Sequence, residues 1–202
     1  FSEPSYVVGT STNLTMDSNV LRFAYNSMVN PGTLYEYNME NKESIILKEK
    51  EIVGGYNQNE FICERIWATG RDGTKIPMSM VYKKGMKKDG NNPTLLYAYG
   101  SYGYSIDPSF SSNRLSLLER GFIFVIAHIR GGEEMGRKWY DDGKLLKKKN
   151  TFYDFIDCSQ YLIDEKYCTS SNLYASGGSA GGLLMGTIIN LNPELYNGVI
   201  AH

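Results

Sequence analysis

The run Gly177 to Gly182, Gly-Gly-Ser-Ala-Gly-Gly, places a serine among small residues. It lies between the apolar residues 173–175 and a helix-like stretch at 183–192, so we expect a strand, a sharp turn and a helix with Ser179 at the apex. Such a turn strains the backbone of the serine and needs small neighbours for the strand and helix to pass closely. The hydroxyl would act as a nucleophile, and the N–H of Ala180 would stabilise a developing oxyanion. The pattern predicts a serine hydrolase.

Two other interpretations of this run are weaker. A glycine-rich turn can hold a serine by chance, but the strand and helix patterns on either side favour a nucleophile. Turns of this kind also bind phosphate, yet a phosphate-binding loop needs a Lys-Ser or Lys-Thr pair after its last glycine, and Leu183-Leu184 stands there.

The groups that would activate Ser179 are missing from the sequence after it. A histidine takes the proton from the serine, an aspartate orients the histidine, and in hydrolases with a strand-turn-helix serine the chain order is Ser, Asp, His. Only 23 residues follow Ser179, with no aspartate and one histidine, His202. For His202 we favour a structural or polar role at a strand end over that of the base, and His128, which precedes the serine, fits a core histidine. The chain starts at Phe1 without a methionine and stops within a predicted strand, so we expect an inactive fragment of a longer enzyme.

The elements before the run fall into two groups. Residues 1–54 hold four short strand patterns separated by turn signals, which is typical of an antiparallel meander such as a propeller blade. These strands are expected at 5–8, 20–27, 33–38 and 44–48. Gly54-Gly55 then forms a flexible joint, and we place a domain boundary there.

From residue 55 onward the pattern is α/β. A hairpin is predicted around Arg71-Asp72-Gly73, with strands at 65–68 and 76–83. Further strands are expected at 94–99, 122–129, 173–175 and 199–201, and helices at 114–120, 152–165 and 183–192. The uninterrupted apolar run 122–127 implies burial on both faces, as in a parallel sheet covered by helices.

The helix at 152–165 has a legible start. Asn150 or Thr151 is expected as its N-cap, with Asp154 in the first turn. The lysines at 147–149 before it predict a solvated surface, and we assign them no function.

Composition excludes several classes of protein. The 21 basic and 22 acidic residues give a net charge of −1, so nothing predicts binding to nucleic acid or to an anionic membrane. The longest apolar run, 121–129, is too short to span a membrane. We therefore expect a soluble protein. Three cysteines without C-x-x-C spacing suggest neither a disulfide framework nor a metal site, and they favour a reducing, cytoplasmic compartment. Asn13-Leu14-Thr15 matches a glycosylation acceptor but is interpreted as a turn.

An ordered set of motifs resembles the prolyl oligopeptidase family of serine peptidases, and within it the oligopeptidase B branch. The resemblance runs through nearly the whole chain. The motifs are Asp72-Gly73-Thr74-Lys75-Ile76-Pro77, Leu96-Tyr97-Ala98-Tyr99-Gly100-Ser101-Tyr102-Gly103, Arg114-Leu115-Ser116-Leu117-Leu118, Ile129-Arg130-Gly131-Gly132, residues 143–152, and residues 177–182.

This resemblance implies an incomplete α/β-hydrolase domain at 55–202, preceded at 1–54 by the last part of a β-propeller. It makes Ser179 the nucleophile, and it makes the Ala180 N–H and the Tyr99 hydroxyl the oxyanion donors. Without the family, Tyr99 would be a strand aromatic packed against its neighbours. Tyr102 is implied as a wall of the substrate pocket, although a locally packed loop aromatic is equally plausible.

The function implied is a serine oligopeptidase that cleaves short peptides after Arg or Lys through an acyl-enzyme, without cofactor or metal. The acidic residues of such a pocket would lie beyond residue 202. A prolyl-specific peptidase, an acylaminoacyl peptidase and a carboxylesterase are alternatives on the same fold. An inactive hydrolase-like fragment or binding module is the non-enzyme alternative. The sequence leaves the oligomeric state open.

Overall fold

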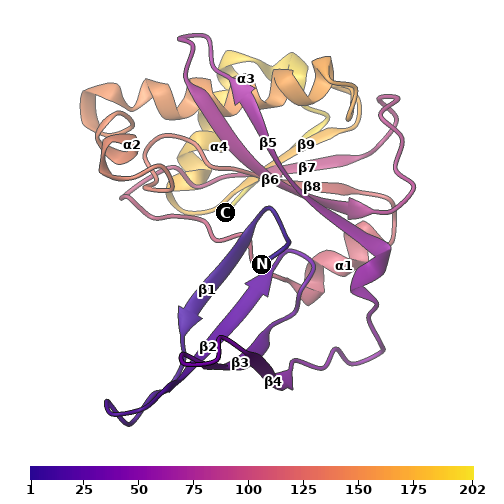
Figure 1. The fold of residues 1–202 in the computed structure, drawn as a ribbon. Helices are drawn as coiled ribbons and strands as arrows, with labels where there is room; N and C mark the ends of the chain where they lie inside the picture. The colour runs from indigo at the N-terminus through magenta and orange to yellow at the C-terminus, as the bar shows by residue number, and fades with distance from the viewer.

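The computed structural model describes residues 1–202, and its strands form two separate sheets (Figure 1). The smaller sheet is an antiparallel meander in the order β1-β2-β3-β4, as the alternating pattern of the first residues predicts. Its strands are β1 (Tyr6–Thr10), β2 (Val20–Ser27), β3 (Thr33–Asn38) and β4 (Ser44–Glu49).

The larger sheet has six strands in the order β10-β9-β7-β8-β6-β5. The first four are parallel to one another, whereas β6 and β5 join as an antiparallel hairpin. Its strands are β5 (Phe61–Thr69), β6 (Lys75–Lys83), β7 (Thr94–Tyr97), β8 (Ile123–Ala127), β9 (Leu173–Gly177) and β10 (Gly198–Ala201). The predicted hairpin is confirmed, and Gly73 in its turn has a φ of 82°.

Helices cover both faces of this sheet (Figure 1). The main core lies under α3 and α4, where Phe155 and Met185 are fully buried against Met80 and Val125. A smaller cluster lies on the opposite face under α1, where Leu118 packs with the adjacent strand residues Val81 and Ile126. The helices are α1 (Ser112–Leu118), α2 (Arg137–Asp141), α3 (Lys149–Asp164) and α4 (Ala180–Leu191), with 3-10 turns η1 (Gln58–Glu60), η2 (Leu145–Lys147) and η3 (Pro193–Leu195).

The start of α3 differs from the prediction. The helix begins at Lys149, and neither Asn150 nor Thr151 caps it. Both side chains serve tertiary contacts instead: Asn150 donates to the Asp142 carbonyl, and Thr151 donates to the carbonyls of Arg130 and Gly143. The longer helix moves Asp154 out of the first turn.

The two sheets are joined by polar contacts. The Ser5 and Ser79 hydroxyls lie 2.6 Å apart, and the Phe110 N–H donates to the Asn26 side chain over 2.7 Å. The Tyr56 hydroxyl donates to the Val29 carbonyl. The smaller sheet therefore rests on the face of the larger sheet that carries α1.

Candidate active site

Ser179 occupies the turn between β9 and α4, and its backbone is strained. Its φ of 55° and ψ of −117° lie where a side chain is seldom tolerated, and the residue is exposed. The turn is tight because its flanks are glycines: a Cβ on Gly177 would lie 2.5 Å from the Gly181 carbonyl oxygen. Ser179 is the exposed residue of this turn, and its neighbours in the run are buried or partly buried.

The last residue of the chain holds the turn from the side of β10. The Ser179 N–H donates to the His202 carbonyl over 2.9 Å, and the His202 N–H donates to the Gly177 carbonyl over 3.1 Å. A Cβ on Gly182 would lie 2.8 Å from the His202 carbonyl oxygen. His202 thus contacts the turn through its backbone while its side chain is exposed. Sequence patterns gave no sign of this backbone contact.

Tyr99 follows β7, the strand next to β9. Tyr97 pairs with Ser176 in the parallel register, so both strands end at the same edge of the sheet, where ligands collect in open α/β sheets. The approach is close, since a Cβ on Gly181 would lie 2.8 Å from the Ala98 carbonyl oxygen and 3.6 Å from the Tyr99 Cα. The structure therefore brings the backbones of Tyr99 and the serine turn into contact.

A cavity of about 470 Å³ opens beside the turn. It is lined by Ser101, Tyr102, Gly131, Tyr140, Gly143, Lys144, Leu145, Lys148, Ala180 and Leu183. Tyr102 is exposed and has a φ of 60°, and Leu145 has a φ of 49°. Together with Ser179 they are three of the five non-glycine residues with positive φ, so backbone strain is concentrated around this cavity.

Comparisons with known proteins agree with this geometry. The model of the prolyl oligopeptidase family matches residues 108–202. Dipeptidyl aminopeptidase BI of Pseudoxanthomonas mexicana is 50% identical over 199 residues, which cover 98% of this chain and 27% of that protein. Protease 2 of Moraxella lacunata is 43% identical over 200 residues, which cover 99% of this chain and 29% of that protein. Oligopeptidase B of Leishmania major has a TM-score of 0.91 at 42% identity, covering 100% of this chain and 28% of that structure.

The chain belongs to the prolyl oligopeptidase family. It spans less than a third of the length of these relatives. The predicted fold class is confirmed: an incomplete α/β-hydrolase domain is preceded by the last part of a β-propeller. The resemblance to oligopeptidase B that the motifs indicated is confirmed as well.

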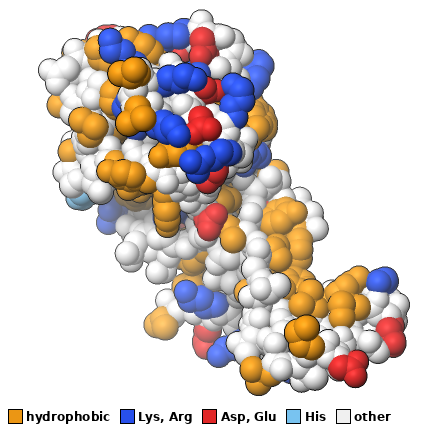
Figure 2. All heavy atoms as spheres, turned by 90° about the vertical axis from the view of Figure 1, so that its left-hand side faces the viewer, with side chains coloured by type: hydrophobic (Ala, Val, Ile, Leu, Met, Phe, Trp, Pro, Cys, Tyr) orange, Lys and Arg blue, Asp and Glu red, His pale blue; other side chains and the backbone are white.

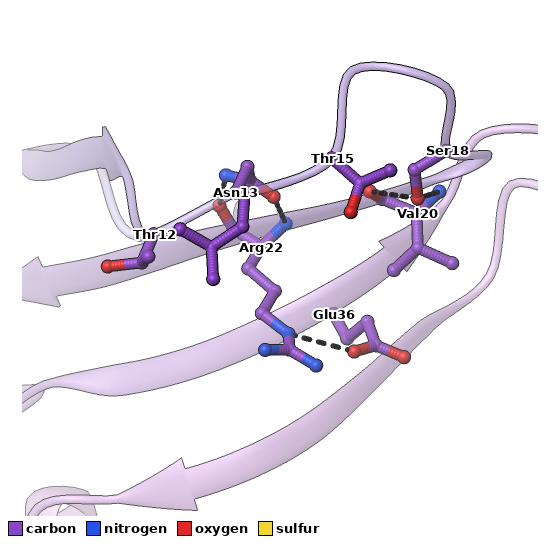
Figure 3. Close-up of a pocket in the computed structure, with 8 residues that line it drawn as sticks. Thr12, Asn13, Thr15, Ser18, Val20, Arg22 and Glu36 are labelled. Carbon is purple, nitrogen blue, oxygen red and sulfur yellow. Dashed lines mark hydrogen bonds and ion pairs between the residues drawn. The ribbon is translucent and has the colours of Figure 1, made fainter.

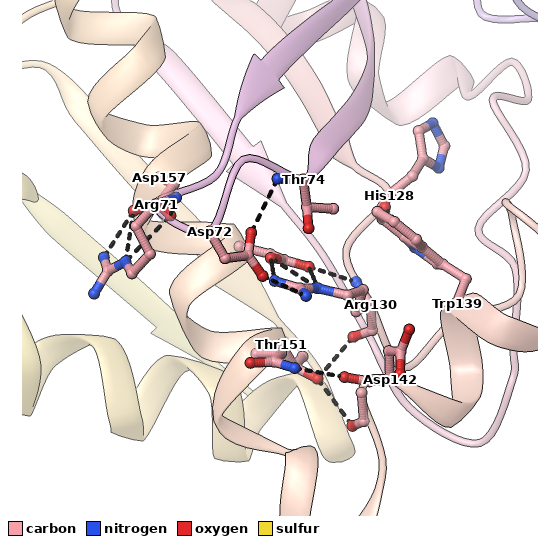
Figure 4. Close-up of polar contacts among 12 residues, drawn as sticks. Arg71, Asp72, Thr74, His128, Arg130, Trp139, Asp142, Thr151 and Asp157 are labelled. Atoms are coloured by element: carbon pink, nitrogen blue, oxygen red, sulfur yellow. Dashed lines mark hydrogen bonds and ion pairs between the residues drawn. The ribbon is translucent and has the colours of Figure 1, made fainter.

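Arg130, in one of the motifs that carry the resemblance to the prolyl oligopeptidase family, is the buried centre of an ion-pair network that reaches the surface at Asp72 (Figure 4). Its guanidinium donates to Asp154 on α3 over 2.6 Å and to Asp72 in the β5–β6 turn over 2.7 Å. Burial would lower the pKa of Arg130, but its hydrogen bonds with Asp154 outweigh this effect and the pKa is raised. Burial likewise opposes ionisation of Asp72, yet bonds from Thr74 and Arg130 lower its pKa to about 2. The network fixes the loop after β8 to the helix and to the hairpin.

Between the Arg130 network and the cavity, the backbones of several loops pack closely against one another. Gly131 has a φ of 103°, and a Cβ there would lie 2.2 Å from the Gly100 carbonyl oxygen. A Cβ on Gly143 would lie 2.2 Å from the Gly131 nitrogen. Three loops of this prolyl oligopeptidase-family chain therefore meet at glycines, and one of the three is the loop that carries Tyr102.

Lys148 is the residue of this region whose environment the sequence mispredicted. Lys147 and Lys149 are exposed as expected, but Lys148 is half-buried and donates to the Gly100 carbonyl and the Ser101 hydroxyl, over 2.6 Å each. Burial lowers its pKa to about 8. Extending the predicted helix by one turn would have placed Lys148 on the same face as Thr151 and Phe155, and this was the available signal.

His128 is a core histidine with one satisfied nitrogen. Its Nε2 lies 2.8 Å from the Ser79 hydroxyl, while Nδ1 has no hydrogen-bond partner and lies 3.6 Å from the Glu134 carboxylate. The order Ser79, His128, Glu134 resembles a catalytic triad. Ser79 is nevertheless fully buried, so no substrate reaches it.

Other surface features lie away from the serine turn. A cavity of about 440 Å³ sits on the smaller sheet, where Asn13 bonds the backbone of Arg22, and Arg22 pairs with Glu36 (Figure 3). These polar groups satisfy one another. Asn13 lies in the loop between β1 and β2, where the structure has no regular turn at 13–15. On the face that carries α2, Lys and Arg side chains gather with acidic ones between them (Figure 2). Lys138 on α2 pairs with Asp142. None of the helices has the length and apolar character that a membrane crossing needs.

Proposed function

We propose that the protein containing this chain is a serine peptidase that hydrolyses short peptides, with Ser179 as its nucleophile. The observation that carries the proposal is the strained, exposed Ser179 at the carboxyl edge of the sheet, in a chain of the prolyl oligopeptidase family. Its curated relatives include proteins named dipeptidyl aminopeptidase, protease and prolyl endopeptidase.

In the proposed mechanism the Ser179 hydroxyl attacks the scissile carbonyl carbon of the peptide. The Ala180 N–H and the Tyr99 hydroxyl donate to the carbonyl oxygen as it becomes negative, which stabilises the tetrahedral intermediate. Collapse of the intermediate expels the amine and leaves an acyl-enzyme, which water hydrolyses. The histidine that moves the proton and the aspartate that orients it would lie in the full-length protein, in regions that correspond to the parts of the relatives outside the match.

The division of the chain follows from the same proposal. Residues 1–54 belong to the propeller domain, which would limit access to short peptides, and residues 55–202 belong to the catalytic domain. The break between the β1–β4 and β5–β10 sheets supports a boundary between β4 and β5. A cytoplasmic location remains a prediction from the three free cysteines, of which Cys158 and Cys168 are buried.

Cleavage after Arg or Lys is proposed from the resemblance to oligopeptidase B. The cavity beside Ser179 presents Lys144 and Lys148 and no carboxylate, so the acids that would pair with a basic substrate side chain must come from elsewhere. A second candidate, release of dipeptides from a free amino terminus, is favoured by the 50% identity to a relative named dipeptidyl aminopeptidase BI.

Two measurements on the full-length protein test the proposal. A fluorophosphonate probe should label the wild type and Ser116→Ala, whose serine is exposed on α1, but not Ser179→Ala. Labelling that survives Ser179→Ala would refute the nucleophile. Peptides with Arg, Lys or Pro before the scissile bond, each with a free or a blocked amino terminus, then separate cleavage after a basic residue, cleavage after proline and release of dipeptides. Turnover of blocked Arg and Lys peptides supports the endopeptidase, and turnover of unblocked dipeptide substrates alone supports the second candidate.

A further inference from the structure

The Gly100 carbonyl lies in a confined place directly after Tyr99. Gly100 has a φ of 65°, and a Cβ there would lie 2.6 Å from the Thr151 side chain. The Gly131 backbone covers the carbonyl oxygen so closely that a Cβ on Gly131 would overlap it. No backbone N–H donates to this oxygen. A buried carbonyl in this position requires a side-chain donor.

Lys148 is that donor. Its ammonium lies 2.6 Å from the Gly100 carbonyl oxygen and 2.6 Å from the Ser101 hydroxyl, and Ser101 is itself buried. Hydrogen bonds from an ammonium are stronger than those between neutral groups. The adjacent Lys147 turns outward and pairs with Asp142, so the inward position is a property of Lys148 alone among the three lysines.

These bonds anchor one end of the loop that carries the candidate site. At the other end the Gly103 N–H donates to the Gly131 carbonyl over 2.9 Å. Between the two anchors Tyr102 projects into solvent with its strained backbone, and its ring centroid lies 6.5 Å from that of Tyr99. Without the first anchor, the hydrogen bond that remains to residues 100–101 is the local one from the Tyr104 N–H to the Ser101 carbonyl, which ties the loop to itself and not to α3.

We propose that Lys148 is a positioning residue for peptide hydrolysis: its ammonium fixes residues 100–101 and thereby the Tyr99 hydroxyl beside Ser179. This inference rests on the proposed function. Lys148 contacts neither substrate nor reacting atoms, and it acts through Tyr99. An interaction used in the transition state changes kcat more than KM, and a small misplacement of such a group has a large effect on rate.

The test uses Lys148→Met in the full-length enzyme, because methionine keeps an unbranched apolar stem but donates no hydrogen bond. We expect kcat to fall by roughly 10- to 100-fold and KM to change by less than about threefold. Lys149→Met, at an exposed neighbouring position, is the matched control and should retain full activity. Thermal melting of each variant checks the fold. If Lys148→Met does not fold, Lys148→Gln, which keeps a neutral donor, replaces it, with a smaller loss expected.

A double-mutant cycle distinguishes positioning from general support of the structure. If Lys148 acts through Tyr99, its substitution has little further effect on kcat in a Tyr99→Phe background. Full additivity of the two losses, or a Lys148 variant as active as the Lys149→Met control, would overturn the inference. An inactive wild type, or activity that survives Ser179→Ala, would instead overturn the proposed function.

Discussion

Gly181→Ala should disturb the candidate site through one added methyl group. Gly181 lies in the first turn of α4, where the helix passes the end of β7. The new Cβ would lie 2.8 Å from the Ala98 carbonyl oxygen and 3.6 Å from the Tyr99 Cα. Gly186, five residues later in the same helix, has no heavy atom within 4 Å of its would-be Cβ and serves as the matched control.

The magnitude follows from these distances. An ordinary contact begins near 3.4 Å, so β7 and α4 must separate by 3.4 − 2.8 = 0.6 Å at this point. Alanine favours the helix by about 1 kcal/mol over glycine, whereas overpacking costs roughly 1–3 kcal/mol. Gly181→Ala should therefore destabilise the protein by up to about 2 kcal/mol, and Gly186→Ala should stabilise it by up to about 1 kcal/mol. The same separation moves Tyr99 away from Ser179, which should lower kcat/KM by roughly tenfold or more.

Melting temperatures and steady-state kinetics of the two full-length variants measure both effects. We expect opposite changes in melting temperature, and a loss of activity in Gly181→Ala alone. If Gly181→Ala proved as stable and as active as Gly186→Ala, the close approach of β7 and α4 would have no role in positioning Tyr99.

Three further predictions concern the same region and the sheet edges. Tyr99→Phe should lower kcat by roughly 10²- to 10³-fold, the effect of removing one oxyanion donor; an unchanged kcat would exclude that role. Because burial lowers the pKa of Lys148 to about 8, its ammonium is lost as the pH rises through that value. The wild type should therefore lose activity on this alkaline limb, and a Lys148→Met profile with the same limb would contradict the assignment. The isolated 202-residue chain should melt broadly, because β4 exposes Ile45 and Ile46 and β10 pairs with β9 on one side only, which leaves its outer edge open; a sharp, reversible calorimetric transition would argue otherwise.

The features that the sequence predicted are those encoded locally. Consecutive small residues predict the serine turn, and Asp72-Gly73 predicts the β5–β6 hairpin. Both have the expected structure. The apolar run of β8 indicated a strand buried on both faces, and five of its residues form one.

The features that it mispredicted depend on partners distant in the chain. Threonine is a residue type that often caps helices, but the Thr151 hydroxyl donates to the carbonyls of Arg130 and Gly143 instead. Lys148 belongs to a charged run, yet it turns toward Gly100, 48 residues earlier. Local propensity cannot reveal such contacts, because they exist only once β7, β8 and α3 have packed together.

The hydrogen bond between the Ser179 N–H and the His202 carbonyl has a consequence for biosynthesis. The acceptor is synthesised 23 residues after the donor. A nascent chain that ends after α4 holds the entire Gly-Gly-Ser-Ala-Gly-Gly run but lacks the strand that braces it. Its serine has no restraint from β10 and is free to relax from the strained conformation. Translation therefore completes the glycine-rich turn only when β10 emerges from the ribosome and docks on β9.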